Sequence, residues 1–337
     1  IPQRRVFLDD SHAVGYGKCL IAPPGKPRKF YVLDSERSRE LLADAVNTLG
    51  SLEDFEALAT LARRVGDDDG RPIRHVTVIG GGFLGSEVAL ALARLGRDRG
   101  MEVAQVYAEK APMQRLLPGY LALQLQKRLE AAGVRPIAER LVTDFRLDSA
   151  VSGGSGGVEL VLQAWDKRSV ETDHIVLAST HIEPDTQVAR ASGLEIDQNN
   201  GGIVVNGQFE AVAGVYAAGG VASYYDPALG RRRIDRYDHS VNSGMSLMAG
   251  YNMAAAMMQQ SYAGISGGPS PPADLNGNGD SAGDGGGGNC GGGEPRGPHP
   301  RLYTHQPMFR SHLADLDIVI EGVGEIDARL RTVGMWV

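Results

Sequence analysis

The segment Val76–Glu87 has the residue spacing with the clearest chemical consequence in this sequence. It reads VTVIGGGFLGSE, so Gly80, Gly82 and Gly85 form a G-x-G-x-x-G motif after a β-branched run. In such a strand–turn–helix unit the glycines allow a tight turn, a close approach to a pyrophosphate and close packing of helix on strand. The free N–H groups at the helix start then face the phosphates. The segment is therefore predicted to bind a dinucleotide.

A predicted strand at residues 102–107 follows the helical stretch and leads to Glu109. In dinucleotide folds an acid at this place holds the ribose diol of the adenosine. A carboxylate also repels a 2′-phosphate, so Glu109 favours NAD over NADP. The alternative is a glycine turn in an unrelated strand-to-helix crossing. The order of strand, glycines, helix, strand and acid favours the nucleotide site.

The composition limits the classes of partner. A chain of 337 residues is long enough for about two domains. Its net charge of −7 disfavours nucleic acid or a membrane surface as the general partner, because phosphates are repelled on average. Cys19 and Cys290 lie far apart and outside any C-x-x-C, which predicts neither a disulfide framework, a zinc site nor a redox-active dithiol. No run reaches the roughly 20 apolar residues that span a bilayer. The first residues have no signal-peptide pattern or initiator Met, so we expect an internal piece of a longer protein.

Strand and helix patterns alternate around the glycine motif. A short strand at residues 18–22 ends at two prolines, and apolar spacing predicts a helix from Ser38 to Val65 with Ser51 and Asp54 as cap residues. The nucleotide unit, residues 74–182, is predicted to contain a helix near 120–132 and strands near 158–165 and 174–178. This alternation predicts a mostly parallel sheet.

A second set of elements follows. Short strands at 202–206 and 214–219 end in glycine, and a helical pattern covers 238–260. A strand leading through Gly219 and Gly220 into a helix suggests a second dinucleotide-type layer. Residues 263–300 are rich in glycine and proline and predict a flexible insert. Strand patterns return at 317–321 and 332–336.

Motifs spread along the chain resemble the apoptosis-inducing factor family of FAD-dependent pyridine-nucleotide oxidoreductases. They are YGKCLIA at 16–22, the glycine segment at 75–87, ETDHIV at 171–176, GLEID at 193–197, residues 225–233, Asp238-His239, Ser243-Gly244 and HQPMF at 305–309. The resemblance extends from about residue 16 to residue 333, apart from the glycine-rich insert. The chain is identified as a member of this family.

The resemblance implies an α/β fold with two interleaved Rossmann-like dinucleotide-binding folds, the FAD part incomplete, and an α+β C-terminal domain. The expected parts are a remnant of the FAD-binding domain and connecting helix at 1–65, the NAD-binding Rossmann domain at 66–182, the second part of the FAD-binding domain at 183–262, the flexible insert at 263–300 and a truncated, dimerisation-type C-terminal domain at 301–337.

The resemblance also implies a function. NADH transfers hydride to FAD, and the electrons pass on to a diffusible acceptor. A mitochondrial location in the intermembrane space, a homodimer that forms on reduction, a mitochondrial protein partner and nuclear translocation in cell death are implied as well. The alternative is a flavin-less NAD(H)-binding interaction module without turnover.

Carried over residue by residue, the resemblance implies a cofactor site. Its residues are Gly80, Gly81, Gly82, Phe83, Leu84, Gly85, Glu109, Arg115 in place of a lysine, Thr180 in place of a glycine, Asp235 and Glu321. Two of the expected roles are catalytic. Phe83 is similar to an aromatic residue that gates the nicotinamide, or is a core phenylalanine at a helix start. Glu87 would face the flavin edge, or complement the helix dipole.

The flavin side departs from the family pattern. An Ala-Thr-Gly-Gly motif reads Ala22-Pro23-Pro24-Gly25, a Gly-Asp whose carboxylate holds the ribityl chain reads Gly219-Gly220, paired histidines read Arg236-Tyr237, and an aromatic residue beside the flavin is Arg310. Prolines remove N–H donors, and glycine offers no carboxylate. The family's first glycine-rich motif and flavin-facing lysine would lie upstream of Ile1. We expect this chain alone to hold little FAD.

Other groups of charged residues give weaker indications of a binding site. Arg231, Arg232 and Arg233 form a positive cluster, which the resemblance connects with binding to the phosphates of nucleic acid; the alternative is a solvated or salt-bridged cluster. Asp67–Asp69 lacks the ligand spacing of a calcium loop, and the scattered histidines predict no metal site. No nucleophile, base and orienting acid can be assembled, which fits a class in which the cofactor carries the chemistry.

Overall fold

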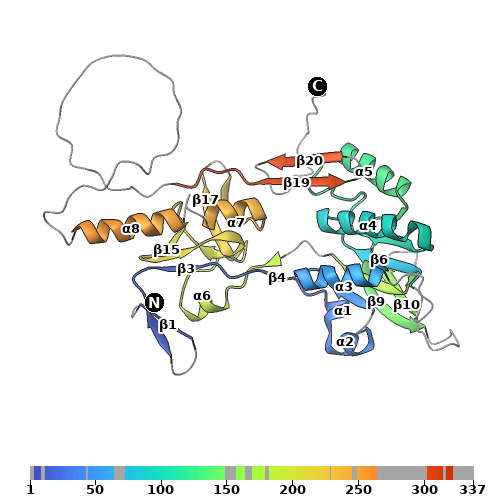
Figure 1. The fold of residues 1–337 in the computed structure, drawn as a ribbon, viewed down its shortest axis with the longest axis horizontal. Coiled ribbons are helices and arrows are strands. Elements are labelled where there is room, and N and C mark those ends of the chain that lie inside the picture. Colours follow the sequence, from blue (N-terminus) through green and yellow to red (C-terminus); the bar gives the residue numbers. More distant parts are fainter. Residues whose placement is uncertain are drawn as a thin grey trace, which may run out of the picture. The chain divides into compact units, whose positions relative to one another are not determined.

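A computed structural model describes residues 4–8, 12–42, 45–63, 73–148, 157–163, 169–178, 182–227, 229–244, 249–263, 302–313 and 316–321. It divides into two compact units, and Figure 1 labels many of their helices and strands. Unit 1 is formed by Ile1–Pro24 and Pro184–Gln306, and unit 2 by Gly25–Glu183 and Pro307–Val337. Each unit therefore uses two separate stretches of the chain. Residues 264–300 of the insert predicted at 263–300, the strand predicted at 332–336 and Asp67–Asp69 lie outside the described residues.

A five-stranded parallel sheet forms the centre of unit 2. In spatial order it contains β5 (Val46–Thr48), β12 (His174–Leu177), β6 (His75–Ile79), β7 (Glu102–Val106) and β8 (Val134–Ile137). All four strand pairs are parallel. The strands are rich in buried valine and isoleucine, which is typical of a parallel sheet that is covered on both faces. The sheet confirms the predicted α/β class.

Two long helices connect the sheet strands of unit 2. Helix α4 (Phe83–Gly96) links β6 to β7, with a short 3-10 turn η1 (Arg97–Arg99) after it, and α5 (Gly119–Ala131) links β7 to β8. Ala122, Leu125 and Leu129 of α5 are buried at helical spacing and join the same apolar core as α4. The helix predicted near residues 120–132 is confirmed.

The single helix predicted from Ser38 to Val65 is wrong. The structure has α1 (Tyr31–Asp34), α2 (Glu36–Leu42), β5 and α3 (Leu52–Arg63). Strand β5 interrupts the helical pattern because its β-branched residues pair with β12 at the sheet edge. Ser51 and Asp54 then start α3 as a reciprocal cap: Asp54 Oδ2 accepts the Ser51 N–H at 2.8 Å, and Ser51 Oγ accepts the Asp54 N–H at 3.4 Å.

Antiparallel strands complete unit 2. A three-stranded sheet is formed by β9 (Leu141–Asp148), β10 (Gly157–Gln163) and β11 (Ser169–Thr172), and a short pair by β4 (Lys26–Pro27) and β13 (Ile182–Glu183). The hairpin of β19 (Met308–Leu313) and β20 (Leu316–Glu321) comes from the far end of the chain. It contacts α4, so residues more than 200 positions apart in sequence cover the helix that begins at the glycine motif.

Unit 1 holds shorter strands. Strand β3 (Cys19–Ile21) pairs in parallel with β16 (Val215–Ala217), which also pairs with β15 (Glu210–Val212). A second sheet contains β14 (Ile203–Val204), β17 (Ala222–Asp226) and β18 (Gly230–Arg232). The remaining elements are the hairpin of β1 (Arg5–Phe7) and β2 (Ala13–Gly15), and the helices α6 (Gln187–Ala191), α7 (Tyr237–Gly244) and α8 (Ala249–Ala263).

The helical pattern predicted at 238–260 matches α7 and α8, but the strand before Gly219-Gly220 does not lead straight into it. A 3-10 turn, η2 (Gly219–Val221), leads instead into β17 and β18, and helix begins only at Tyr237. Strand β17 contains the buried Tyr224 and pairs antiparallel with β18. This pairing stabilises a hairpin at the place where the motif predicted a connection from strand to helix.

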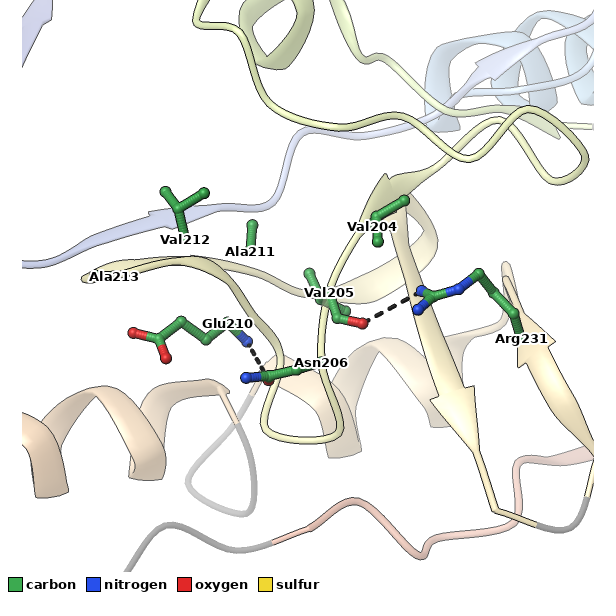
Figure 2. A pocket seen from close by; sticks show the side chains of 8 residues that line it. All are labelled: Val204, Val205, Asn206, Glu210, Ala211, Val212, Ala213 and Arg231. Carbon is green, nitrogen blue, oxygen red and sulfur yellow. Dashed lines mark hydrogen bonds between the residues drawn. The ribbon is translucent and has the colours of Figure 1, made fainter. Parts of the chain in front are cut away.

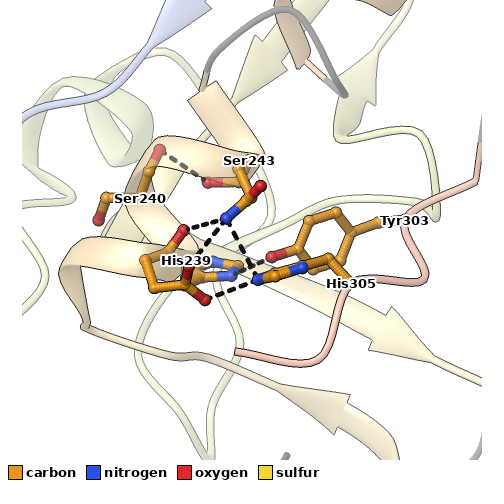
Figure 3. A network of polar contacts seen from close by, with 7 residues as sticks. His239, Ser240, Ser243, Tyr303 and His305 are labelled. Atoms are coloured by element: carbon orange, nitrogen blue, oxygen red, sulfur yellow. Dashed lines mark hydrogen bonds and ion pairs between the residues drawn. The ribbon is translucent and has the colours of Figure 1, made fainter. Parts of the chain in front are cut away.

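A buried aromatic and polar network holds the residues before β19 against α7 (Figure 3). His239 Nδ1 lies 2.9 Å from Tyr303 Oη, and the rings of Phe209 and Tyr224 pack against both residues. His305 Nε2 lies 2.6 Å from the carboxylate of Asp238. These contacts fix residues 302–306 within unit 1.

The burial of His239 predicts a loss of stability in acid. Desolvation, with the nearby His305 and Arg232, lowers the pKa of His239 to about 4. The unfolded chain takes up this proton near pH 6.5, and the folded chain only near pH 4. The free energy of unfolding should therefore fall between those values, with a contribution from His239 of about 3 kcal/mol. Urea unfolding of His239→Gln should show a weaker dependence between pH 7 and pH 4.5, and an unchanged dependence would contradict this assignment.

Candidate functional site

The glycine turn after β6 leaves no space for a side chain at Gly80 or at Gly85. Gly80 has φ of +136°, and a Cβ there would lie 2.4 Å from the carbonyl oxygen of Ala178 at the end of β12. A Cβ on Gly85 would lie 2.1 Å from the carbonyl oxygen of Gly80. Both glycines are therefore required by the fold of the turn, because any larger residue would separate α4 from β6.

Gly82 has a different reason to be glycine. It is the N-cap residue of α4, with extended dihedral angles of −80° and −169° that any residue can adopt. No side chain caps the helix, and its first turn holds no acidic residue. The first N–H groups of this 14-residue helix are thus left for an outside acceptor, and the helix dipole makes that acceptor an anion. The residues present therefore fit the pyrophosphate of a dinucleotide.

The end of β7 lies directly against this turn. A Cβ on Gly81 would be 2.6 Å from Tyr107 Cβ and 3.5 Å from Glu109 Oε2. The Met113 N–H donates to the Gly81 carbonyl at 2.6 Å, which closes the loop after β7 onto the glycines. The structure thus brings Glu109 and the glycine motif together, in the arrangement that the sequence predicts.

Strand β19 covers the first turns of α4. The Phe83 ring is 7% exposed and its centroid lies 3.7 Å from that of Phe309. Ser311 donates its hydroxyl to Glu87 Oε1. The burial of Phe83 agrees with its alternative as a core phenylalanine, and the roles of Phe83 and Glu87 toward a cofactor stay predictions.

The other predicted NAD-site residues are more scattered. Leu84 is half-buried and packs against the core, and Arg115 is exposed in the loop before α5. Glu321 is the last residue of β20 and pairs with Met308. Asp235 belongs to unit 1, and Thr180 lies outside the described residues.

One residue beside the glycine turn was not predicted from the sequence. Gln105 in β7 is buried, and its amide nitrogen lies 3.1 Å from Ser86 Oγ in α4. The signal that would have indicated Gln105 is a glutamine among the apolar residues Val103, Ala104 and Val106, because a buried amide needs hydrogen-bond partners.

The positions that the resemblance assigns to FAD do not fit it here. Strand β3 is followed by Pro23 and Pro24, which have no N–H groups. The Gly219 N–H donates to Ser243 Oγ at 2.8 Å, so this donor is already used within unit 1. A Cβ on Gly220 would lie 2.6 Å from Asp235 Oδ1, so the carboxylate of Asp235 fills the side-chain space of the turn.

The arginine cluster in unit 1 is used internally. Arg231 donates to the Ser223 carbonyl at 2.7 Å, Arg232 pairs with Asp226 at 3.2 Å, and Arg233 donates to the Asn200 carbonyl at 2.8 Å. These contacts agree with a structural cluster, which was the alternative to phosphate binding. Among the described residues, no group of three His, Cys, Asp or Glu could hold a metal ion.

A cavity of about 350 Å³ lies beside Arg231 in unit 1 (Figure 2). Val204, Val205, Val212 and other residues of the β14 and β15 region line it. Its polar ends take part in the fold: Arg231 donates to the Val205 carbonyl at 3.3 Å, and Asn206 Oδ1 accepts the Glu210 N–H at 3.0 Å. The glycine turn therefore remains the stronger candidate site.

Unit 2 combines a parallel sheet, a glycine turn, an uncapped helix and an acidic residue after the next strand. Together these features define a dinucleotide-binding domain. Residues 2–244 match the family described as pyridine nucleotide-disulphide oxidoreductase. The chain belongs to that family.

Known relatives agree with this assignment. The chain is 31% identical over 337 residues to apoptosis-inducing factor 1, mitochondrial, of Dictyostelium discoideum, covering 100% of this chain and 51% of that protein. It is 31% identical to the putative apoptosis-inducing factor 1, mitochondrial, of Drosophila melanogaster, covering 99% of this chain and 36% of that protein. The chain thus spans about half the length of the first relative and about a third of the length of the second. The resemblance to apoptosis-inducing factor is confirmed.

A solved structure supports the fold. The covalent putidaredoxin reductase–putidaredoxin complex matches with a TM-score of 0.67 and 18% identity, over 96% of this chain and 61% of that chain. The chain therefore shares the Rossmann-type α/β fold of that structure. No helix in the described ranges has the length and apolar character to cross a membrane.

Proposed function

We propose that this chain binds NADH at the Gly80–Gly85 turn and presents it as the hydride donor of an apoptosis-inducing-factor-like oxidoreductase. The observation that carries the proposal is the uncapped N-terminus of α4 with the Glu109 carboxylate beside it. Bound NADH supplies a hydride from its nicotinamide. Family membership supports an oxidoreductase of the NAD(P)H-dependent class.

The residues in and beside the turn bind different parts of NADH. The first N–H groups of α4 hold the pyrophosphate, and the absence of a side chain on Gly82 lets it approach. The carboxylate of Glu109 accepts hydrogen bonds from the ribose hydroxyls of the adenosine. Phe83 and Glu87 lie near the start of the same helix, where the nicotinamide end of the cofactor would be oriented.

The wider setting is proposed from the relatives. Two of them are named as mitochondrial apoptosis-inducing factors, which supports a mitochondrial location and a part in cell death. A homodimer on reduction, a location in the intermembrane space, a mitochondrial protein partner and movement to the nucleus belong to the same proposal. The family and its structural neighbours point to FAD as the partner of NADH, although the flavin positions of this chain are altered.

A second function is favoured by the turn at Gly219-Gly220. Because Asp235 fills the side-chain space of this turn, a flavin-less NAD(H)-binding module without turnover is the competing proposal. NADH-dependent dye reduction by the purified chain at saturating added FAD separates the two. Dye reduction that depends on the added FAD supports the oxidoreductase, and NADH binding without dye reduction at saturating FAD supports the module.

The proposal predicts a preference for NADH over NADPH. The Glu109 carboxylate should repel the 2′-phosphate and hydrogen-bond the free ribose hydroxyls, so NADPH should bind at least about tenfold more weakly, equal to about 1.4 kcal/mol. Glu109→Gln keeps the size of the side chain and removes its charge, so it should narrow the difference. Calorimetric titration at low salt measures both affinities. Equal affinities of the unmodified chain for the two coenzymes would contradict the role of Glu109.

A further inference from the structure

A buried amide lies beneath the glycine turn. Gln105 is 1% exposed in the middle of β7, and its amide nitrogen donates to the Gly80 carbonyl at 2.9 Å. The same nitrogen lies 3.1 Å from Ser86 Oγ in the first turns of α4. One side chain thus connects the second strand of the nucleotide fold, the glycine turn and the helix.

This hydrogen bond fixes the plane of one peptide group. In a trans peptide the carbonyl of Gly80 and the N–H of Gly81 point in opposite directions. Because Gln105 holds the Gly80 carbonyl toward the buried cluster, the Gly81 N–H is turned away from that cluster. The Gly81 carbonyl accepts from the Met113 N–H.

The peptide needs such a fixed partner. Gly80 and Gly81 have no side chains, so rotation of the peptide between them meets little steric resistance. The Gly80 carbonyl oxygen lies 2.1 Å from the place that a Cβ on Gly85 would take, and its hydrogen bond to Gln105 is part-buried. Without the amide, this carbonyl would lose its partner at a cost of about 1 kcal/mol, and a rotated peptide would relieve that cost.

We propose that Gln105 is a positioning residue for NADH: it orients the Gly80–Gly81 peptide so that the Gly81 N–H faces the pyrophosphate. This inference rests on the proposed function, since it assigns a role within the same site. Gln105 does not touch the ligand and acts through the backbone of the turn.

Two substitutions separate this role from a merely structural one. Gln105→Met keeps the length of the side chain and removes the donor to Gly80. Ser86→Ala removes the other contact of the same amide and leaves the bond to Gly80 in place. The two residues are similarly buried, so both variants test a lost hydrogen bond in one cluster. The probe is ADP-ribose, which has the pyrophosphate and no nicotinamide, and its affinity is measured by calorimetry on variants that unfold cooperatively.

We expect Gln105→Met to weaken ADP-ribose binding at least about tenfold and Ser86→Ala to change it less than about twofold. Equal losses in the two variants, or full affinity in Gln105→Met, would overturn the positioning role and leave the proposed function standing. A wild-type chain that does not bind ADP-ribose would overturn both.

A measurement on the unmodified chain covers the case in which Gln105→Met fails to fold. Amide NMR should show the Gly81 N–H moving downfield when ADP-ribose is added, as expected for a new bond to a charged oxygen. The Gly100 N–H, in a turn at the other end of α4, serves as the control and should not move. A Gly81 amide that responds no more than Gly100 would overturn the inference.

Discussion

Replacing Gly82 by valine should remove NADH binding while the protein stays folded. A β-branched residue can adopt the extended dihedral angles of Gly82, so we expect the backbone of the turn to stay unchanged. The valine side chain would stand in front of the first N–H groups of α4. Hydrogen bonds to a charged oxygen are each worth about 1.5–3 kcal/mol, so losing them should weaken binding at least about 100-fold.

Two other glycines provide controls for Gly82→Val. Gly119 begins α5, and a Cβ there meets no atom within 4 Å, so Gly119→Val should fold and bind NADH normally. Gly85→Val should disturb folding itself, because its Cβ would collide with the Gly80 carbonyl. Circular dichroism measures the fold and calorimetry the affinity. Unchanged NADH affinity in a folded Gly82→Val protein would show that the pyrophosphate lies elsewhere.

The purified chain should contain little flavin. Residues 1–337, purified without added cofactor, should contain far less than one FAD per chain and oxidise NADH near the background rate. The reason is local: Pro23 and Pro24 offer no N–H groups, and the turn at Gly220 has no carboxylate of its own. A yellow protein with stoichiometric FAD and rapid NADH-dependent dye reduction would contradict this expectation.

Restoring the family's aspartate at position 220 should not restore flavin binding. A Cβ on Gly220 would lie 2.6 Å from Asp235 Oδ1, so Gly220→Asp brings two carboxylates together and should destabilise unit 1 by about 1–3 kcal/mol. Asp235→Ala should relieve this cost in the double variant. Additive unfolding free energies in the double-mutant cycle would contradict the predicted contact.

The sequence alone predicted the features of the site that rest on local pattern. Gly80 and Gly85 could be identified because a tight turn and a close helix each exclude a side chain, and those constraints act within a few residues. Glu109 could be placed because parallel strands end at one edge of the sheet, which brings the residues after β6 and β7 together.

Features that depend on tertiary pairing could not be predicted in this way. Strand β5 follows a helical pattern and becomes a strand only because β12 offers an edge. The cover of Phe83 by Phe309 joins residues far apart in sequence. The same holds for Asp235, whose carboxylate lies beside Gly220 although the two residues are 15 positions apart.

Hydrogen exchange of the unmodified chain with and without NADH tests the central claim most directly. If α4 holds the pyrophosphate, NADH should slow exchange in the segments Gly80–Ser86 and Tyr107–Met113, which form the turn and the loop that closes on it. The turn at Gly219–Val221 should show no comparable change. Protection at Gly219–Val221 with none at Gly80–Ser86 would contradict the account.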